Sequence, residues 1–154
     1  FEALKNGYTK YSNPQGIYEL RKLISEYFFT QNNIDTNPEN IIITSGSKQA
    51  CALIMMSLLE PYDEVINFCP CYVSYIPQIK ISEPNAKIVN IDFLKTNNSP
   101  DWNLVSKSLS NKTKLIIINT PNNPTGYMFN QSDINELSKL MLKFPNCYLK
   151  LFSH

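Results

Sequence analysis

The chain has 154 residues, a net charge of +1 and a hydrophobic fraction of 43%, values typical of a globular domain with its own core. The 14 basic residues include one arginine, Arg21, and form no cluster, which argues against nucleic acid or an anionic membrane as a partner. The longest apolar runs, such as residues 51–56, are far shorter than the roughly 18 residues that a membrane-spanning helix needs. No signal-peptide pattern opens the chain, so we expect a cytoplasmic protein.

The four cysteines do not form the paired CxxC spacing of a metal site, and the single histidine is His154. We therefore predict no metal centre. Cys51 and Cys147 lie in apolar patterns, where a buried free thiol is the default. A disulfide framework is not expected for a chain of this size and type.

Residues 1–15 are predicted to be a lead-in segment, because Asn6-Gly7 favours a turn and the residues that follow are polar. After Gly16, apolar residues recur with helical spacing and predict a helix up to about Phe28. Tyr11 stands just before this helix, where a surface turn residue and a ligand contact explain it equally well. For Arg21 we favour a structural salt bridge or an exposed helix position over a ligand contact.

Residues 41–44 predict a short buried strand, and residues 45–50 then open a helix that runs to about Leu59. At such a helix N-terminus, free backbone N–H groups and the helix dipole converge and favour an anion. Gly46 would let a ligand approach the backbone closely. An ordinary serine N-cap explains the same residues without any ligand.

The rest of the chain alternates aliphatic runs with helical patterns. Strands are predicted at 65–68, 86–91, 114–118 and 146–150, helices at 75–81, 102–109 and 131–143, and a loop at 95–100. This alternation predicts an α/β fold, a three-layer α/β/α domain with a largely parallel sheet. We find no internal repeat and no low-complexity segment.

The most informative stretch follows the aliphatic run 115–118, which suits a strand buried on both faces. Two prolines, two asparagines and a glycine come next, and then a helix. Open α/β sheets bind ligands in loops of this kind, at the carboxyl ends of their strands. The prolines hold Asn123 in a stiff frame with its amide available to a ligand, although a polar connection of ordinary turn residues would also fit.

This segment, Asn122-Asn123-Pro124-Thr125-Gly126, resembles the signature of class I and II aminotransferases, which use pyridoxal 5'-phosphate (PLP) and share the aspartate aminotransferase fold. The resemblance implies that Asn123 hydrogen-bonds the phenolic oxygen of PLP and that the bond before Pro124 is cis. It also implies that the turn at 45–50 holds the phosphate through Ser47 and Lys48. The matching tyrosine, Tyr11, reaches the phosphate of a neighbouring subunit in such enzymes, which implies a homodimer.

Two positions depart from the family pattern. Tyr72 aligns with a tryptophan that lies flat on the pyridine ring in prokaryotic aspartate aminotransferases. With Asn123 it would contact both cofactor and substrate, although tyrosine there weakens the aspartate-specific assignment. Tyr62 stands where the family has glycine, and a positive φ at this position would cost about 1 kcal/mol.

The family's motif with the aspartate that pairs with the pyridine nitrogen should fall near Phe152, which is no carboxylate. The Schiff-base lysine, the phosphate-binding arginine and the arginine for the substrate carboxylate have no counterpart, so no catalytic residue is assigned. The resemblance makes residues 16–154 an incomplete PLP-binding large domain. We expect a segment of an aminotransferase acting on an amino acid, aspartate-like by preference, and a 2-oxo acid. The alternatives are an inactive truncated or frameshifted remnant with weak phosphate or PLP binding, and a lyase or synthase of the same fold.

Overall fold

The structure is a computed structural model that describes residues 1–92 and 99–152. It divides into two compact units, residues 1–50 and 51–154, each of which is described by itself. Most of the loop expected at 95–100 lies outside the described residues, as does His154. The expected division into residues 1–15 and 16–154 stays a prediction.

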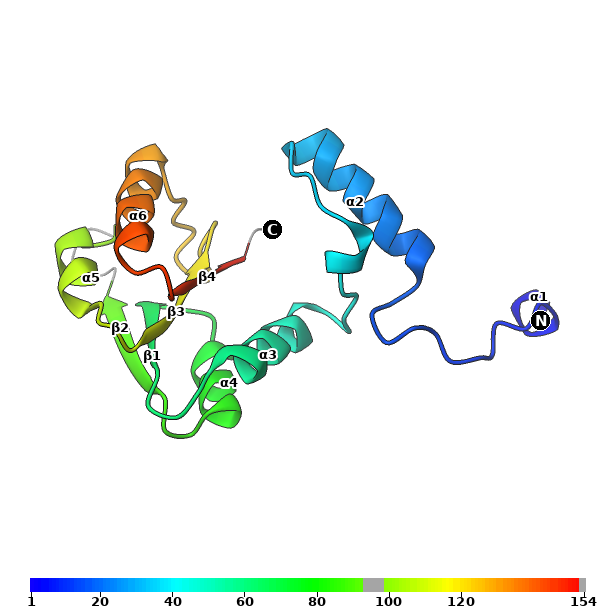
Figure 1. Ribbon diagram of the computed structural model, residues 1–154, viewed down its shortest axis with the longest axis horizontal. Helices are drawn as coiled ribbons and strands as arrows, with labels where there is room; N and C mark the ends of the chain where they lie inside the picture. Colours follow the sequence, from blue (N-terminus) through cyan, green and yellow to red (C-terminus); the bar gives the residue numbers. More distant parts are fainter. Residues whose placement is uncertain (93–98, 153–154) are drawn as a thin grey trace. The chain divides into compact units, whose positions relative to one another are not determined.

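The second unit contains a parallel sheet of four strands in the order β2-β1-β3-β4 (Figure 1). The strands are β1 (Glu64–Cys69), β2 (Lys87–Asp92), β3 (Thr113–Asn119) and β4 (Tyr148–Phe152). The two central strands are buried along almost their whole length, as continuous aliphatic runs require in a sheet covered on both faces. All four strands predicted in this part of the sequence are confirmed.

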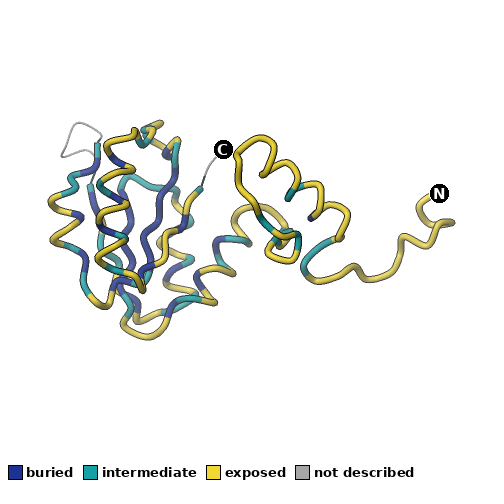
Figure 2. Tube along the Cα trace, turned by 45° about the horizontal axis from the view of Figure 1, so that its top comes forward, coloured by how far each residue is buried: buried dark blue, intermediate teal, exposed yellow. Residues whose placement is uncertain are grey.

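Helices cover both faces of this sheet (Figures 1 and 2). On one face, α3 (Ser47–Leu58) and α4 (Tyr75–Ser82) pack on side chains such as Leu115 and Ile117. On the other, α5 (Trp102–Ser108) and α6 (Gln131–Lys143) pack on Ile116 and Ile118. Successive strand residues point to opposite faces, so one strand supplies both cores. The predicted three-layer α/β/α architecture is confirmed.

The first unit contains α1 (Glu2–Lys5), α2 (Tyr18–Asn32) and the 3-10 helix η1 (Pro38–Asn40). The buried residue of α2 is Arg21, whose side chain bonds to the segments before and after the helix. Nη1 donates to the Pro38 carbonyl at 2.8 Å and lies 3.4 Å from Glu39, while Nε donates to the Gly16 carbonyl at 3.3 Å. The preferred prediction of a structural role for Arg21 is therefore confirmed.

The predicted strand at 41–44 is wrong. In the described chain these residues are extended but pair with no strand, and the N–H of Ile43 donates instead to the Gln15 carbonyl at 2.8 Å. The aliphatic run suggested burial on both faces, yet Ile42 is 60% exposed. A strand requires a neighbour as well as a sequence pattern, and here the neighbouring backbone is the turn before Gly16.

The turn before β1 places Tyr62 at a positive φ, the conformation considered for this position in the sequence. Tyr62 has φ +71°, in the region that favours glycine. The turn is closed on both sides of Tyr62: the N–H of Asp63 donates to the Glu60 carbonyl at 3.1 Å, and the Asp63 carboxylate accepts from the N–H of Glu60 at 2.9 Å. These bonds offset the local cost, and the strand follows despite the departure from glycine.

No helix in the described part of the chain is both long and apolar enough to cross a membrane.

Candidate ligand site at the carboxyl edge of the sheet

The loops that follow β1 and β3 meet at the carboxyl edge of the sheet, and Asn122 joins them. Its Nδ2 donates to the Pro70 carbonyl at 3.1 Å and to Thr125 Oγ1 at 2.8 Å. The residue is only 5% exposed. A buried amide that bridges two loops fixes their spacing, because each unmade hydrogen bond would leave a buried polar group unpaired.

The backbone of Asn122 closes the loop after β3 into a tight turn. Its carbonyl accepts from the N–H of Gly126 at 2.7 Å, and its own N–H donates to the Tyr127 carbonyl at 2.8 Å. Gly126 has φ +74°, which glycine adopts without strain. Within this frame the Asn123–Pro124 bond is cis, as the resemblance implied, and Asn123 is exposed. The predicted availability of Asn123 to a ligand fits this placement.

Sequence reasoning selected Asn123 and missed Asn122. Both are asparagines in the same turn, so residue type carries no signal that separates them. The available signal was the turn itself: the amide of an Asn at the start of a turn commonly bonds groups a few residues further on. Its bond to Pro70 joins parts of the chain that are far apart in sequence, and required the fold.

Tyr72 lies on the neighbouring loop, two residues after the carbonyl that Asn122 binds. Its half-buried ring makes an edge contact with Tyr75, with centroids 5.6 Å apart and planes at 76°. Tyr75 is buried, and burial raises the pKa of its hydroxyl to about 12. The structure thus brings Tyr72 and Asn123, two of the predicted site residues, onto adjoining loops at one edge.

The end of β4 carries Phe152, opposite Asn119 in the register. The Phe152 ring stacks on Tyr75 with centroids 5.4 Å apart and planes at 22°, and Lys150 Nζ lies 4.6 Å from the Phe152 centroid. Lys150 is 5% exposed and its ammonium has no hydrogen-bond partner among the described residues. Burial lowers the Lys150 pKa, an effect partly offset by the nearby Cys51 thiol. This corner of the site therefore holds an aromatic ring and a desolvated amine.

The other predicted contacts belong to the turn at the start of α3, in the first unit. Gly46 has φ +85°, and no atom lies within 4 Å of the position that a Cβ would take there. Gln49 Oε1 accepts from the N–H of Ser45 at 2.6 Å, which closes the turn before Ser47 and Lys48. The predicted helix start is confirmed. The convergence of Ser47 and Lys48 with Tyr72 and Asn123 joins two units and stays a prediction.

Tyr11 is fully exposed, and its predicted contact with a second subunit is likewise untested.

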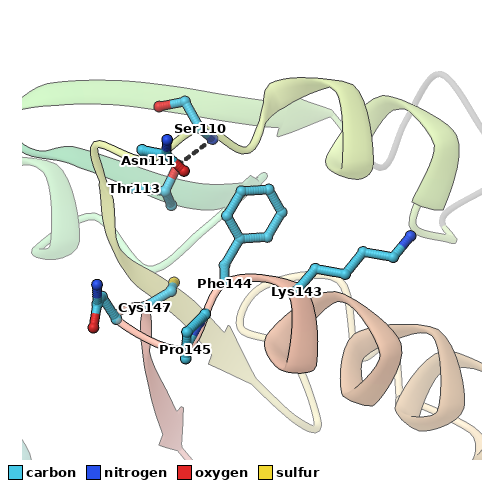
Figure 3. A pocket seen from close by; sticks show the side chains of 8 residues that line it. Ser110, Asn111, Thr113, Lys143, Phe144, Pro145 and Cys147 are labelled. Carbon is cyan, nitrogen blue, oxygen red and sulfur yellow. Dashed lines mark hydrogen bonds between the residues drawn. The ribbon is translucent and has the colours of Figure 1, made fainter.

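The second unit also has a small cavity of about 90 Å³, shown in Figure 3. It is lined by residues next to the amino ends of β3 and β4, among them Thr113, Phe144 and Cys147. The N–H of Ser110 donates to Thr113 Oγ1 at 2.9 Å beside it. Because strands in a parallel sheet all point one way, this cavity is at the opposite edge from Asn122 and Asn123. It is not part of the candidate site.

A parallel α/β/α sheet whose ligand loops meet at the carboxyl edge defines a class of small-molecule-binding domains. Comparison with known proteins narrows the class: the family model of aminotransferase class I and II matches residues 2–149. The chain belongs to this family.

Individual relatives agree with the family match. The aspartate aminotransferase of Thermotoga maritima is 40% identical over 140 residues, which are 91% of this chain and 37% of that protein. A probable aspartate aminotransferase of Methanocaldococcus jannaschii is 41% identical over 138 residues, or 90% of this chain and 36% of that protein. The chain therefore spans little more than a third of the length of these relatives.

Solved structures give the same result. The crystal structure of the Thermotoga maritima aspartate aminotransferase matches with a TM-score of 0.88 at 38% identity, covering 97% of this chain and 40% of that one. The Thermus thermophilus aspartate aminotransferase with maleate matches with a TM-score of 0.86 at 31% identity, covering 99% of this chain and 43% of that one.

Proposed function

We propose that this chain is the front part of the PLP-binding domain of an aminotransferase, which transfers an amino group between an amino acid, aspartate-like by preference, and a 2-oxo acid. The observation that carries this proposal is the turn at 122–126, clamped to the loop after β1 by the Asn122–Pro70 hydrogen bond and presenting Asn123 at the carboxyl edge. The similarity to aspartate aminotransferases supports the choice of substrate class.

Most of the residues fit a bound PLP. The exposed Asn123 amide would bond its phenolic oxygen, and the half-buried Tyr72 ring offers a surface for stacking on the pyridine. Ser47, Lys48 and backbone N–H groups at the start of α3 would hold the phosphate. Tyr11 would reach the phosphate of the second subunit in a homodimer. When bound, PLP supplies an electron sink for the reacting carbon of the amino acid.

The position facing the pyridine nitrogen does not fit. By the resemblance, the carboxylate should fall near Phe152, and the amine beside this ring, Lys150, is a cation when protonated. A cation would disfavour a protonated pyridine nitrogen through like-charge repulsion. We therefore propose that the 154-residue polypeptide alone holds the cofactor weakly and does not transaminate. This mismatch also favours the second candidate, an inactive remnant.

The binding test uses pyridoxine 5'-phosphate, which has the phosphate and ring of PLP but no aldehyde, so imines with surface lysines cannot form. We expect saturable binding that Asn123→Ala weakens about fivefold to tenfold, on the order of one hydrogen bond. Asn146→Ala alters an exposed asparagine outside the candidate site and should change nothing. Absence of saturable binding, or equal loss in the two variants, would reject the site.

The activity test mixes the purified polypeptide with PLP, aspartate and a 2-oxo acid. We expect no turnover, against a typical enzyme rate of about 10 per second. Measurable turnover would show that the chain supplies its own catalytic lysine, contrary to the proposal. Sequencing the coding region beyond the codon for His154, in all frames, separates the segment of an active enzyme from the remnant.

A further inference from the structure

Cys69 and Cys71 bring two thiols together at the carboxyl end of β1. Each sulfur lies 3.3 Å from the same atom, Nδ2 of Asn67. Asn67 is 1% exposed, and its Nδ2 also donates to Asn90 Oδ1 at 3.0 Å. The Cys69 thiol in turn donates to Asn90 Oδ1 at 3.3 Å. The buried Asn67 and the exposed Asn90 therefore hold both sulfurs around one atom.

The side-chain hydrogen-bond contacts of Asn67 all involve one atom of its amide, Nδ2. Its Oδ1 is buried and has no hydrogen-bond partner in the described chain, whereas Nδ2 has three acceptors within 3.3 Å. An NH₂ group has only two protons to share among them. The position of this side chain is therefore set by the two sulfurs and by Asn90, and the thiols cannot move apart without loss of these contacts.

The sequence spacing of the two cysteines also permits a covalent bond. Residues two apart have Cα atoms no more than about 7 Å from each other, and a disulfide needs about 4.4–6.8 Å. Both cysteines are half-buried and free, so a small reagent can reach them. The other two, Cys51 and Cys147, are free but buried, at 3% and 6% exposure. Oxidation in the folded state should thus select the first pair.

We propose that Cys69 and Cys71 form a redox-active dithiol that a hydroperoxide oxidises to an intramolecular disulfide. One thiolate attacks the peroxide, breaks the O–O bond and becomes a sulfenic acid, with release of water or an alcohol. The second sulfur attacks the sulfenic sulfur, forms the S–S bond and expels water. In total the two thiols lose two protons and two electrons, and the hydroperoxide accepts both electrons. Pro70, between the cysteines, accepts the Asn122 hydrogen bond, so the new bond would act directly on the loop contact described above.

The reaction should accelerate in alkaline solution. Burial, followed by the charges and hydrogen bond of the neighbouring Cys71 and the charge of Asp92, raises the Cys69 pKa to about 11. The thiolate is the nucleophile. Where Cys69 is the attacking sulfur, the rate should therefore rise about tenfold for each pH unit from neutrality up to this pKa.

The experiment treats the whole 154-residue chain with hydrogen peroxide and measures its intact mass, its free thiols and its disulfide-linked peptides. We expect loss of two hydrogens per chain, a fall from four thiols to two, and a link between Cys69 and Cys71. Cys69→Ser and Cys71→Ser should each abolish this product, while Cys51→Ala and Cys147→Ala should retain it. Oxygen adducts without the disulfide, a link between two chains, or survival of the product in Cys69→Ser would overturn the proposal.

A second variant tests the role of the fold, because cysteines two residues apart can also pair in an unfolded chain. Asn67→Leu keeps the branched shape of the side chain but removes the atom that both sulfurs contact. We expect it to slow closure several-fold, while helical circular dichroism shows that it remains folded. Equal rates for Asn67→Leu, the native protein and the protein in concentrated urea would show that the structure does not gather the thiols.

Discussion

Lys150 Nζ lies 4.6 Å from the centroid of the Phe152 ring, and apart from the nearby Cys51 thiol this ammonium has no polar partner among the described residues. A cation over an aromatic face gains roughly 0.5–2 kcal/mol. Removing the donors of a charged group from water without partners costs about 1–3 kcal/mol or more. The balance is unfavourable, so Lys150 lowers the free energy of unfolding of the second unit.

We therefore expect Lys150→Met to stabilise the protein by about 1–3 kcal/mol, because methionine fills similar space without a charge. Urea unfolding followed by circular dichroism measures this change. Lys107→Met replaces an exposed lysine of α5 and should alter stability by no more than about 0.5 kcal/mol. If Lys150→Met is destabilising relative to that control, then the ring contact outweighs the desolvation of the amine.

The stability gained by Lys150→Met should also depend on pH. Because burial lowers the Lys150 pKa from its ordinary value of 10.5, the unfolded chain binds this proton more tightly than the folded one. The penalty is complete at pH values below the folded pKa and disappears as pH rises to 10.5. The difference in unfolding free energy between Lys150→Met and the native protein should thus shrink over that window. Subtracting the two proteins cancels the titration of Cys69, Tyr75 and Tyr127.

A glycine pair tests the packing of the first unit. At Gly16 a Cβ would lie 2.5 Å from Ile43 Cγ1, and φ is +102°. At Gly7 φ is +78°, but no atom lies within 4 Å of the Cβ position. Gly7→Ala should cost about 1 kcal/mol or less, the price of the conformation alone. Gly16→Ala adds a steric clash and should cost about 1–3 kcal/mol more.

Limited proteolysis of residues 1–50 measures this difference, because local opening of this unit exposes its backbone to the protease. We expect much faster cleavage of Gly16→Ala than of Gly7→Ala. Similar cleavage rates would mean that the turn before α2 adapts to a side chain, and that the contact with Ile43 does not fix the extended segment at 41–44.

A third prediction concerns Asp133, whose buried carboxylate accepts from Trp102 Nε1 at 2.8 Å, from the Tyr127 hydroxyl at 2.5 Å and from the N–H of Asn130 at 2.9 Å. Burial, and then the hydrogen bond and charge of Asp133, raise the Tyr127 pKa to about 12. The folded state thus keeps this tyrosine neutral, and its contribution to stability is lost as pH rises from 10 to 12.

Asp133→Asn removes the charge but keeps an acceptor oxygen, so the Tyr127 pKa should fall and still exceed the ordinary value of 10 because burial remains. Carbon-13 NMR of labelled tyrosine rings, with Tyr127→Phe to assign the signal, follows the titration directly. An unchanged pKa in Asp133→Asn would mean that burial alone causes the shift.

The sequence predicts this fold well where local pattern and burial agree. The aliphatic run of β3 and the helical spacing of α6 each identify an element within one or two residues. The segment 41–44 has a similar pattern but lacks a strand to pair with, and pairing is not a local property. Two of the donors to Asp133, Tyr127 and Asn130, lie in the loop just before α6, but Trp102 is 31 residues away and its approach required the folded chain.

In the candidate site, too, local sequence pattern predicts the loops but not the contacts between distant residues. The stretch 122–126 pointed to a ligand loop, and the structure places Tyr72 and Asn123 on adjoining loops. The expectation that the family's aspartate falls near Phe152 came from the sequence and stays a prediction. The surroundings of Phe152 could not be predicted, because the stacking on Tyr75 and the buried amine of Lys150 depend on how two elements, α4 and β4, pack together.

The last prediction compares how Asn122→Ala and Asn123→Ala change the free energy of unfolding. Asn122→Ala removes the bonds to Pro70 and Thr125 and leaves polar groups without their partner in a buried place, so we expect a loss of about 2–3 kcal/mol. Asn123→Ala truncates an exposed side chain, and its cost should be at most about 0.5 kcal/mol. Urea unfolding of both variants at neutral pH makes the comparison. Equal losses of stability would mean that both asparagines stabilise the loop. The argument that the Asn123 side chain is available to a ligand would then fail.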